Sequence, residues 1–344
     1  MAGFRHTFIH LSQRLADLLP PDRLRRWAGQ SSFLPFYHAI ADEPLPHIRH
    51  LYPVKDSRQF AEDLDFLCRH YQPLSISGFE DWLNGGLDLQ RPPMLLSFDD
   101  GLREFHDVIA PILLRKGIPA ICFLNSAFVD NRGLFFRYKA SLLLEALTQN
   151  SGWADDPSCL AWRKAHLPSV QNWQQALLGI RYHNRHLLDE LAAKVSLDFG
   201  AFLRDQQPYL SSPQIRDLQA KGFEFGAHSV DHPEYRWLST EEQLRQTVES
   251  LAFVQTQFGV QRPCFSFPFT DFGVGASFFT RLRAATEVRY TFGCAGQKQD
   301  SAPAHFQRTP LEDGSLSARR IHNAELLYCL LKAPFGKNRI RRHD

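Results

Sequence analysis

Short apolar runs alternate with helical patterns along most of the chain from about residue 31 onward. The runs are five to seven residues long and lie at 33–38, 93–99, 120–124, 223–228, 263–267 and 290–295. Each is apolar on both faces, which is typical of parallel strands that helices cover. Strands alternating with helices in this way predict an α/β fold.

The predicted helices carry signals for their inward faces and their ends. Phe60, Leu64 and Leu67 recur at helical spacing and predict a buried stripe. Ser77 and Glu80 have the spacing of a capping box, which predicts that Ser77 caps the next helix. These signals support the assignment of the segments between the apolar runs as helices.

The alternation stops between about residues 138 and 210. This segment has helical patterns at 139–147, 172–180 and 186–195, and no run typical of a strand. Insertions into loops cost little stability and often shape a substrate site. We therefore predict a helical insertion beside the mouth of the site. The predicted division is an N-terminal helical segment (1–30), a barrel (31–137 and 211–312), the insertion (138–210) and a C-terminal helix with a basic tail (313–344).

The two ends of the chain have patterns of their own. In the first 30 residues, apolar positions 8, 11, 15, 18 and 19 recur at helical spacing, but polar residues interrupt them. We expect an amphipathic helix that docks on its own domain, with weak membrane-surface contact as the alternative, and neither a signal peptide nor a membrane span. The stretch 332–342 is basic, and we expect a solvated, partly frayed tail.

Charge and cysteine usage change this picture little. Lysine plus arginine (39) nearly balances aspartate plus glutamate (37), and a net charge of +2 gives no reason to expect a nucleic-acid partner. The six cysteines are scattered, without a Cys-x-x-Cys pair, and this pattern predicts free, buried thiols. Free thiols fit a reducing compartment, so we expect a cytoplasmic protein.

Two adjacent carboxylates end one of the predicted strands. Asp99 and Asp100 follow the apolar run at 93–98 and precede Gly101. In barrel folds the carboxyl ends of the strands are where active sites collect. Two neighbouring carboxylates repel each other, which favours a division in which one binds a cation and the other takes a proton. An ordinary Asp-Gly turn after a strand is the alternative.

Two histidines follow another predicted strand. His228 and His232 lie four residues apart, and Pro233 disfavours a helical conformation at His232. Two imidazoles and one carboxylate would leave open positions on a divalent ion, as in catalytic metal sites. This ligand set suits zinc, with cobalt, nickel or iron as alternatives. Two unrelated surface histidines are the competing interpretation.

These motifs resemble the polysaccharide deacetylase family, the NodB-type family 4 of carbohydrate esterases. The motifs are SFDDG at 97–101 and His-x-x-x-His at 228–232, with FYHAIADEP, RKGIPAICFLN and FSFPFTDFG as further similar stretches. The likeness covers roughly residues 33–135 and 205–310. It implies a distorted (β/α)7-type barrel of the glycoside hydrolase/deacetylase kind, and removal of an acetyl group from an N- or O-acetylated saccharide.

The resemblance also implies roles for individual residues. Asp99 matches the catalytic base. Asp100, His228 and His232 match the residues that bind the divalent metal ion. Phe269 matches the residue whose backbone N–H holds the oxyanion, a task that needs no particular side chain. We assign Pro268, His38 and Asn125, which lie in the similar stretches, to the oxyanion and substrate-binding group.

Two departures from the family pattern affect the proposed chemistry. Ser266 stands where many members have an arginine that orients the base. We predict that Arg308, at the end of the strand-like run HFQR, takes over this task, because a guanidinium orients a carboxylate and keeps it ionised. The family's late Leu-x-His motif, which supplies the general acid, is not recognisable. His38, His305 and His322 are the candidates for that acid.

We therefore expect a metal-dependent hydrolase of carbon–nitrogen bonds other than peptide bonds, acting on an acetylated saccharide or sugar-linked precursor. Two alternatives stay open, a degenerate carbohydrate-binding protein and a hydrolase of another such bond on the same scaffold. Arg137 and Lys139 are candidates for binding an anionic part of a substrate, with a solvated helix surface as the alternative.

Overall fold

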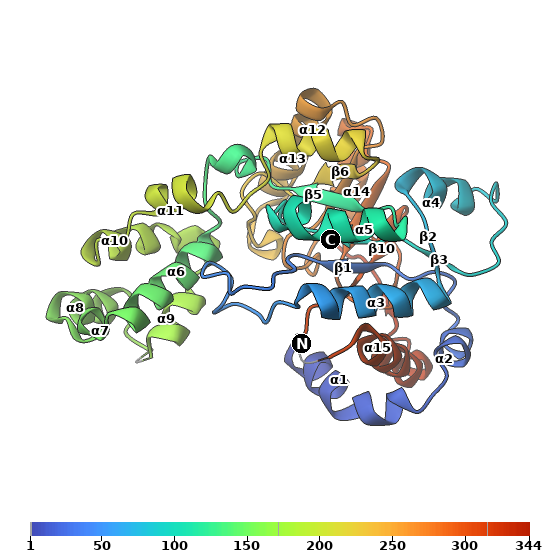
Figure 1. Cartoon of the computed structure of the whole chain (residues 1–344), viewed down its shortest axis with the longest axis horizontal. Coiled ribbons are helices and arrows are strands. Elements are labelled where there is room, and N and C mark those ends of the chain that lie inside the picture. The colour runs from blue at the N-terminus through green and yellow to red at the C-terminus, as the bar shows by residue number, and fades with distance from the viewer. Residues whose placement is uncertain (1, 171, 315) are drawn as a thin grey trace.

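A parallel barrel forms the centre of the computed structural model, which describes residues 2–170, 172–314 and 316–344 (Figure 1). Its strands are β1 (Pro35–Tyr37), β4 (Ser97–Phe98), β5 (Ile121–Leu124), β6 (Glu224–Ala227), β7 (Cys264–Ser266), β8 (Tyr290–Gly293), β10 (His305–Gln307) and β11 (Thr309–Pro310). Their order in the sheet is β10-β8-β7-β6-β5-β4-β1-β11, and all neighbouring strands are parallel. The predicted parallel α/β fold is confirmed.

The sheet nearly closes because its two outermost strands are consecutive parts of one run of chain. β10 pairs with β8, β11 pairs with β1, and Arg308 alone separates β10 from β11. The N–H of Arg308 donates to the carbonyl of Gly293 (3.0 Å), and the N–H of Thr309 donates to that of Leu34 (2.9 Å). Within the described residues, β10 and β11 together occupy one strand position, so the eight strands fill seven positions around the barrel. This is the expected distorted (β/α)7-type barrel.

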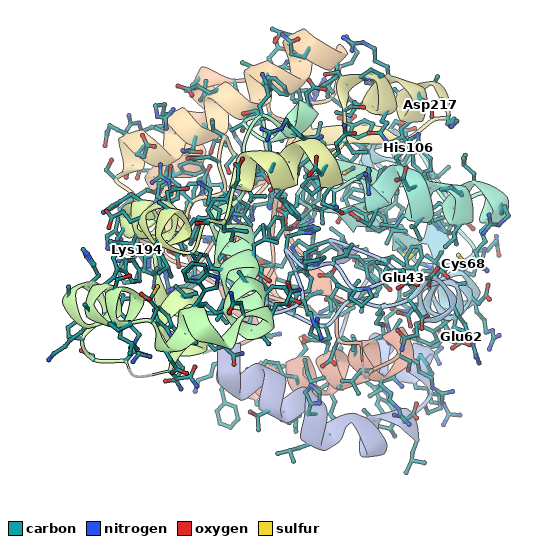
Figure 2. The ribbon with its side chains drawn as sticks, turned by 60° about the vertical axis from the view of Figure 1, so that its left-hand side comes forward. Glu43, Glu62, Cys68, His106, Lys194 and Asp217 are labelled. Atoms are coloured by element: carbon teal, nitrogen blue, oxygen red, sulfur yellow. The ribbon has the colours of Figure 1, made fainter. Side chains whose placement is uncertain are left out.

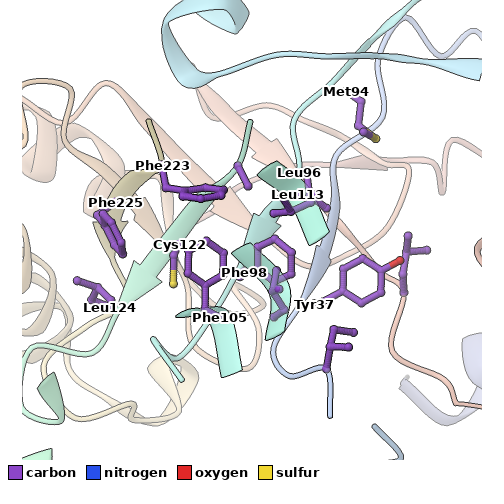
Figure 3. Packing of buried hydrophobic residues seen from close by; sticks show 14 of the residues in the cluster. Tyr37, Met94, Leu96, Phe98, Phe105, Leu113, Cys122, Leu124, Phe223 and Phe225 are labelled. Carbon is purple, nitrogen blue, oxygen red and sulfur yellow. The ribbon is translucent and has the colours of Figure 1, made fainter. Parts of the chain in front are cut away.

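Alternate side chains of the strands pack outside and inside the barrel. Outward residues such as Phe98, Cys122 and Phe225 join one cluster under the surrounding helices (Figure 3). Inward residues such as Phe123 and Phe292, whose ring centroids are 5.5 Å apart, fill the barrel. Gly226 makes room for this filling, because a Cβ there would lie 2.6 Å from the Phe123 ring. The strands are therefore apolar on both faces, as their sequence indicates.

The strands lie where the apolar runs are, but they are shorter. The run 93–99 holds two strands, because β3 (Pro93–Met94) pairs with β2 (Gln72–Pro73) in a separate small sheet before the chain enters the barrel at β4. A further pair, β9 (Gln299–Asp300) and β12 (Arg339–Ile340), forms a second small sheet. Neither small sheet is predicted from the local pattern.

Helices cover the barrel. They are α3 (Ser57–His70), α4 (Ile76–Leu83), α5 (Ala110–Lys116), α12 (Ser212–Ala220), α13 (Thr240–Phe258) and α14 (Ala276–Ala285), with short turns η1 (Phe105–Ile109), η2 (Val129–Asn131) and η4 (Tyr235–Trp237). The predicted stripe of Phe60, Leu64 and Leu67 is fully buried. The prediction for Ser77 is wrong. Ser75 caps α4 and accepts from the N–H of Gly78, and Ser77 lies within the first turn.

In the described part of the chain between β5 and β6, η2 is followed by six helices that precede α12. The helices are α6 (Phe136–Gln149), α7 (Ser151–Asp155), α8 (Pro157–His166), α9 (Trp173–Gly179), α10 (His186–Lys194) and α11 (Phe199–Gln206), with the short turn η3 (Tyr182–Asn184). The described part of 136–206 contains no strand. These helices share a second apolar cluster, which includes Leu143, Leu188 and Leu191 and reaches Leu102 of the barrel. They project to one side of the molecule, where Figure 2 labels Lys194.

The N-terminal helices and the C-terminal helix α15 form one helical layer below the barrel (Figure 1). α1 (Ala2–Asp17) and α2 (Pro21–Trp27) pack against α15 (Ala318–Lys332), which the short turn η5 (Ala333–Phe335) follows. Ile9 and Ala16 of α1 are buried in the main core, whereas Leu11 and Leu18 are exposed. None of the described helices is long and apolar enough to span a membrane.

The basic C-terminal stretch is not a frayed tail, contrary to our expectation. β12 pairs with β9, and the Arg342 side chain, only 5% exposed, lies against the carboxylates of Asp271 and Asp300. Buried carboxylates need a counter-cation, and this arginine provides it. The six cysteines are free, as predicted, and four of them are buried.

Candidate active site

Polar side chains gather where the barrel strands end. Asp99 and Asp100 follow β4, His228 follows β6, and Phe269 lies in the loop after β7. Because parallel strands place their carboxyl ends on one face, these residues line a common cavity of about 410 Å³. Most of the remaining lining is apolar and aromatic, as is typical of small-molecule sites.

Asp100, His228 and His232 converge on one point, as predicted. The Oδ1 atom of Asp100 lies 3.6 Å from Nε2 of His228 and 3.3 Å from Nε2 of His232. All three residues are buried, and each offers a ligand atom within 4.8 Å of the others. The three side chains are therefore close enough to share one ion.

The hydrogen bonding of this set fits a divalent cation. Among the described residues, Oδ1 of Asp100 and Nε2 of His228 have no hydrogen-bond partner although both are buried. Nδ1 of His228 lies 2.8 Å from the carbonyl of Ser266, which can only accept, so Nδ1 carries the proton and Nε2 presents a lone pair. Burial lowers the pKa of His228 to about 4, which keeps the ring neutral. Neutral imidazole and carboxylate are ligands that zinc prefers.

Asp99 is held by Arg308. Nη1 of Arg308 donates to Oδ1 of Asp99 (2.8 Å) and Nη2 donates to Oδ2 (2.7 Å), a bidentate contact. Both side chains are buried. Burial raises the pKa of Asp99, but neighbouring groups, with the Arg308 guanidinium first among them, together hold that pKa below its ordinary value. Asp99 is therefore ionised at neutral pH, and the predicted position of Arg308 is confirmed. Its role in catalysis stays a prediction.

Ser266 takes part in the same network. Its hydroxyl accepts from Nη2 of Arg308 (2.6 Å) and lies 3.3 Å from Oδ2 of Asp99. Arg308 itself sits in the seam between β10 and β11, with its guanidinium 4.3 Å from the Phe36 ring centroid. The arginine thus comes from the segment of β10 and β11 that closes the barrel, and Ser266 lies beside it.

Backbone strain is concentrated around the site. Asp100 (φ 70°), His232 (φ 60°) and Phe269 (φ 54°) all have left-handed conformations that non-glycine residues rarely adopt. Gly101 follows with φ 64°, and a Cβ there would lie 2.7 Å from Leu124. These turns let consecutive residues face different partners, so that Asp99 contacts Arg308 while Asp100 faces the histidines.

Helix α6 contributes a partner of the candidate metal ligand. The hydroxyl of Tyr138, on α6, donates to Oδ2 of Asp100 (2.8 Å), which leaves Oδ1 facing the histidines. Such outer hydrogen bonds orient the ligands of metal sites. Tyr138 is a residue that the sequence analysis missed, because one tyrosine in a helical pattern carries no signal of its own.

His38 is the acid candidate that the structure places in the cavity. Its ring Nδ1 pairs with Glu312, and the same carboxylate accepts from the N–H of Ala39 (3.0 Å). Burial lowers the pKa of His38, but Glu312, together with Asp100 and Asp99, outweighs burial and raises it to about 10. The ring is therefore a cation at neutral pH. Glu312 is a second residue that the sequence did not indicate.

The other two acid candidates lie outside the cavity. His305 is buried with Nε2 3.1 Å from Asp271, and His322 is buried with Nε2 2.5 Å from the hydroxyl of Tyr71. Neither residue lines the cavity within the described part of the chain. The structure thus contradicts both candidates, because each imidazole is engaged in a separate buried contact.

Of the predicted substrate-binding group, Phe269 and His38 line the cavity, and Pro268 and Asn125 do not. The Phe269 ring lies 4.6 Å from that of His232. The amide of Asn125 donates to the carbonyl of His228, so this side chain braces the histidine loop from behind. The carbonyl of Pro268 accepts from the N–H of Thr270 (2.5 Å) within the same turn. Both residues shape the loops around the cavity.

Solved deacetylases share this architecture. The deacetylase PplD of Streptococcus pyogenes is 13% identical, with a TM-score of 0.52 over 85% of this chain and 97% of its own. IcaB from Ammonifex degensii is 15% identical, with a TM-score of 0.52 over 86% and 97%. A de-N-acetylase from Aggregatibacter actinomycetemcomitans is 16% identical, with a TM-score of 0.51 over 85% and 99%. At these identities the likeness shows the fold.

The sequence itself gives the family. No curated protein matches the chain in sequence. The family model for polysaccharide deacetylases matches residues 87–277, more than half of the 344 residues, and this range includes the two aspartates and both histidines. The chain therefore belongs to the polysaccharide deacetylase family, a group of hydrolases that act on carbon–nitrogen bonds other than peptide bonds.

Proposed function

We propose that this protein is a metal-dependent deacetylase that removes the acetyl group from an N-acetylated saccharide or sugar-linked precursor. One observation carries the proposal. A buried, ionised carboxylate held by Arg308 lies beside a second, buried carboxylate that faces two buried histidines. A protein that only bound carbohydrate would have no use for Asp99 in that position.

Asp99 is the general base in this proposal. Its carboxylate lines the cavity and is kept ionised by the bidentate contact with Arg308, so it can take a proton from the attacking water. Arg308 is a positioning residue, because it acts on the rotamer and the charge of Asp99. Ser266 supports both side chains through its hydroxyl.

Asp100, His228 and His232 would hold the divalent ion, most naturally zinc. When bound, such an ion polarises the acetyl carbonyl and lowers the pKa of water. The backbone N–H of Phe269 lies in the loop that lines the cavity, and we assign to it a donor role toward the oxygen that becomes negatively charged. The left-handed φ of Phe269 sets the direction of that N–H.

His38 is the general acid in this proposal. It lines the same cavity as Asp99 and is protonated at neutral pH through Glu312. As the carbon–nitrogen bond breaks, His38 gives its proton to the departing amine, and Glu312 retains the ring in place. The products are the free amine and acetic acid, which then ionises to acetate, and the proton taken by Asp99 balances the proton given by His38.

Acetate release tests the proposal. Metal-free protein would be reconstituted with zinc, cobalt, nickel or iron and offered a panel of N-acetylated and O-acetylated saccharides. We expect metal-dependent acetate release from N-acetylated members. If the protein binds these saccharides but releases no acetate with any metal, it is the degenerate binding protein. Release of a different acyl or amine product would favour another carbon–nitrogen bond as the target.

A further inference from the structure

The cavity contains a cationic side chain that the proposed chemistry does not use. Among the described residues that line the cavity, Arg137 is the single lysine or arginine. It stands at the second position of α6, one residue before Tyr138, and its side chain is 13% exposed. Since the metal ligands, the base and the acid are accounted for, Arg137 is available for another task.

The guanidinium of Arg137 is held in place before any ligand arrives. Its Nη1 donates to the carbonyl of Leu178. Its planar group lies 5.0 Å from the ring centroid of Phe136 and 5.8 Å from that of Phe269. Stacking on aromatic rings and one backbone contact fix the position of the group. Such preorganisation lowers the entropy lost when a ligand binds.

The charge of Arg137 is only partly balanced. Its nearest carboxylate, Glu234, is 3.7 Å from Nη2 and lies closer to a second guanidinium, that of Arg181 (2.7 Å). The other carboxylate on this loop, Asp231, is 3.6 Å from Arg185. Burial lowers the pKa of Arg137, and Arg181 adds to this effect against the opposing influence of Glu234. Arg137 therefore shares Glu234 with a closer cation and is incompletely neutralised at the cavity wall.

We propose that Arg137 binds an anionic group of the substrate, a carboxylate or a phosphate, beside the acetylated sugar. A guanidinium matches either anion through paired N–H donors. Arg137 lies on the same side of the cavity as the candidate metal ligands, because the Phe269 ring centroid is 5.8 Å from its guanidinium and 4.6 Å from the His232 ring centroid. This inference rests on the proposed function and narrows its substrate class to acidic saccharides.

Matched substrates test the subsite. We would compare kcat/KM for a neutral N-acetylhexosamine, the corresponding N-acetylhexosaminuronate and the corresponding N-acetylhexosamine phosphate. We expect at least one anionic substrate to be preferred by about tenfold or more, which is the range of a charge-assisted contact. Comparing the uronate with the phosphate shows whether the subsite prefers a carboxylate or a phosphate group.

Two variants assign the preference to Arg137. Arg137→Gln should remove the preference, chiefly through a higher KM for the anionic substrate, and Arg137→Lys should restore part of it. Lys139→Gln is the matched control, because Lys139 lies on the same helix, pairs with Asp189 (2.6 Å) and does not line the cavity. That control should keep the preference of the wild type.

The outcomes separate the inference from the proposed function. Equal kcat/KM for neutral and anionic substrates, or an unchanged preference in Arg137→Gln, would overturn the inference. Acetate release from none of the substrates would overturn the proposed function. In that case, calorimetric binding of the same three saccharides tests the subsite directly. Tighter anion binding that Arg137→Gln removes would support the inference, and equal binding would refute it.

Discussion

Asp99 and Asp100 share a peptide bond but have different surroundings. Asp99 is bound by the Arg308 guanidinium, whereas Asp100 accepts from Tyr138 and faces two imidazoles. The left-handed backbone at Asp100 separates the two side chains. The repulsion expected between adjacent carboxylates is thus relieved in two ways, by a guanidinium for one and by the metal-binding set for the other.

Exchanging each aspartate for asparagine should separate these roles. Asp99→Asn should retain its metal and lose activity by about 10²–10⁴-fold, the usual contribution of a general base. Asp100→Asn should lose metal as well as activity, because an amide is a poorer ligand than a carboxylate. Metal content by mass spectrometry and acetate release by a coupled assay measure both. A fully active Asp99→Asn would show that another group is the base.

Arg308 should set the acid limb of the pH profile. Its guanidinium lowers the pKa of Asp99, so a weaker contact raises that pKa and reduces the ionised fraction at a given acidic pH. Arg308→Lys keeps the charge but loses the bidentate contact. We expect a lower kcat and an acid limb of kcat/KM shifted to higher pH, with metal content unchanged. Arg308→Met leaves Asp99 buried and unpaired, which costs about 3–5 kcal/mol of stability. An identical pH profile in Arg308→Lys would contradict this role.

At this scale, the sequence predicts residues that belong to short motifs at strand ends. The two aspartates and two histidines stand out because each pair follows an apolar run. Arg308 is predictable because a late strand-like run ends beside it. Tyr138 and Glu312 are not predictable in this way, because their partners Asp100 and His38 lie far away in the chain. An isolated tyrosine or glutamate has no distinguishing pattern in the sequence.

At the scale of elements, the C-terminal strand anchors the loop that carries Phe269. Beyond β12, Arg342 pairs with Asp271 and with Asp300 (2.6 Å), and its Nη1 donates to the carbonyl of Asp271 (2.7 Å). His305 lies 3.1 Å from the same Asp271 carboxylate. Asp271, Asp300 and His305 resemble a metal-binding set, but the guanidinium already supplies the cation there.

Removing this cation should destabilise the protein. Arg342→Met leaves two buried carboxylates without their counter-charge, and we expect a loss of about 3–5 kcal/mol in the free energy of unfolding. Arg341→Met is the matched control, because the Arg341 side chain, next to Arg342 in the sequence, is exposed and should tolerate the change. Denaturant unfolding measures both variants. Equal stability of the two variants would mean that the ion pairs of Arg342 contribute no net stability.

The sequence predicts where the strands lie better than it predicts which strands pair with one another. Apolar runs locate the barrel strands, because burial on both faces leaves a local trace in the sequence. Their shortness, the closure through β10 and β11, and the pairing of β9 with β12 depend on distant segments. The basic stretch at 332–342 predicts a solvated tail, because its charges favour contact with water. The carboxylates of Asp271 and Asp300, which pair with the buried Arg342 side chain, lie in another part of the chain.

At the scale of the whole molecule, three sets of helices surround the barrel. They are the helices that cover the strands, the group α6 to α11, and the terminal layer of α1, α2 and α15. Helix α6 reaches the site through Arg137 and Tyr138, and the terminal layer packs on the barrel through α15. His322 of α15 joins that layer to the barrel, because its Nε2 lies 2.5 Å from the hydroxyl of Tyr71, directly after α3. Its Nδ1 lies 2.9 Å from Oδ1 of Asn323. The ring is therefore a neutral hydrogen-bonded link between layers.

This link should make the stability of the molecule fall in mild acid. Burial lowers the pKa of His322 to about 4, below the ordinary value of 6.5. Between these values the unfolded chain binds a proton that the folded protein does not, so the free energy of unfolding decreases as pH falls through this window. A shift of this size corresponds to about 3 kcal/mol in full. The contribution is present above pH 6.5 and lost progressively toward pH 4.

The variant His322→Gln removes the titrating group while its amide can still accept from Tyr71. We expect its free energy of unfolding to depend less steeply on pH between 7 and 4.5 than that of the wild type, in denaturant titrations at fixed salt. His106→Gln is the control, because the partly exposed His106 lies 3.4 Å from Asp217 at the surface (Figure 2). The control should keep the slope of the wild type. If His322→Gln shows the same slope as well, the acid sensitivity arises from other buried histidines such as His47, whose pKa burial also lowers to about 4.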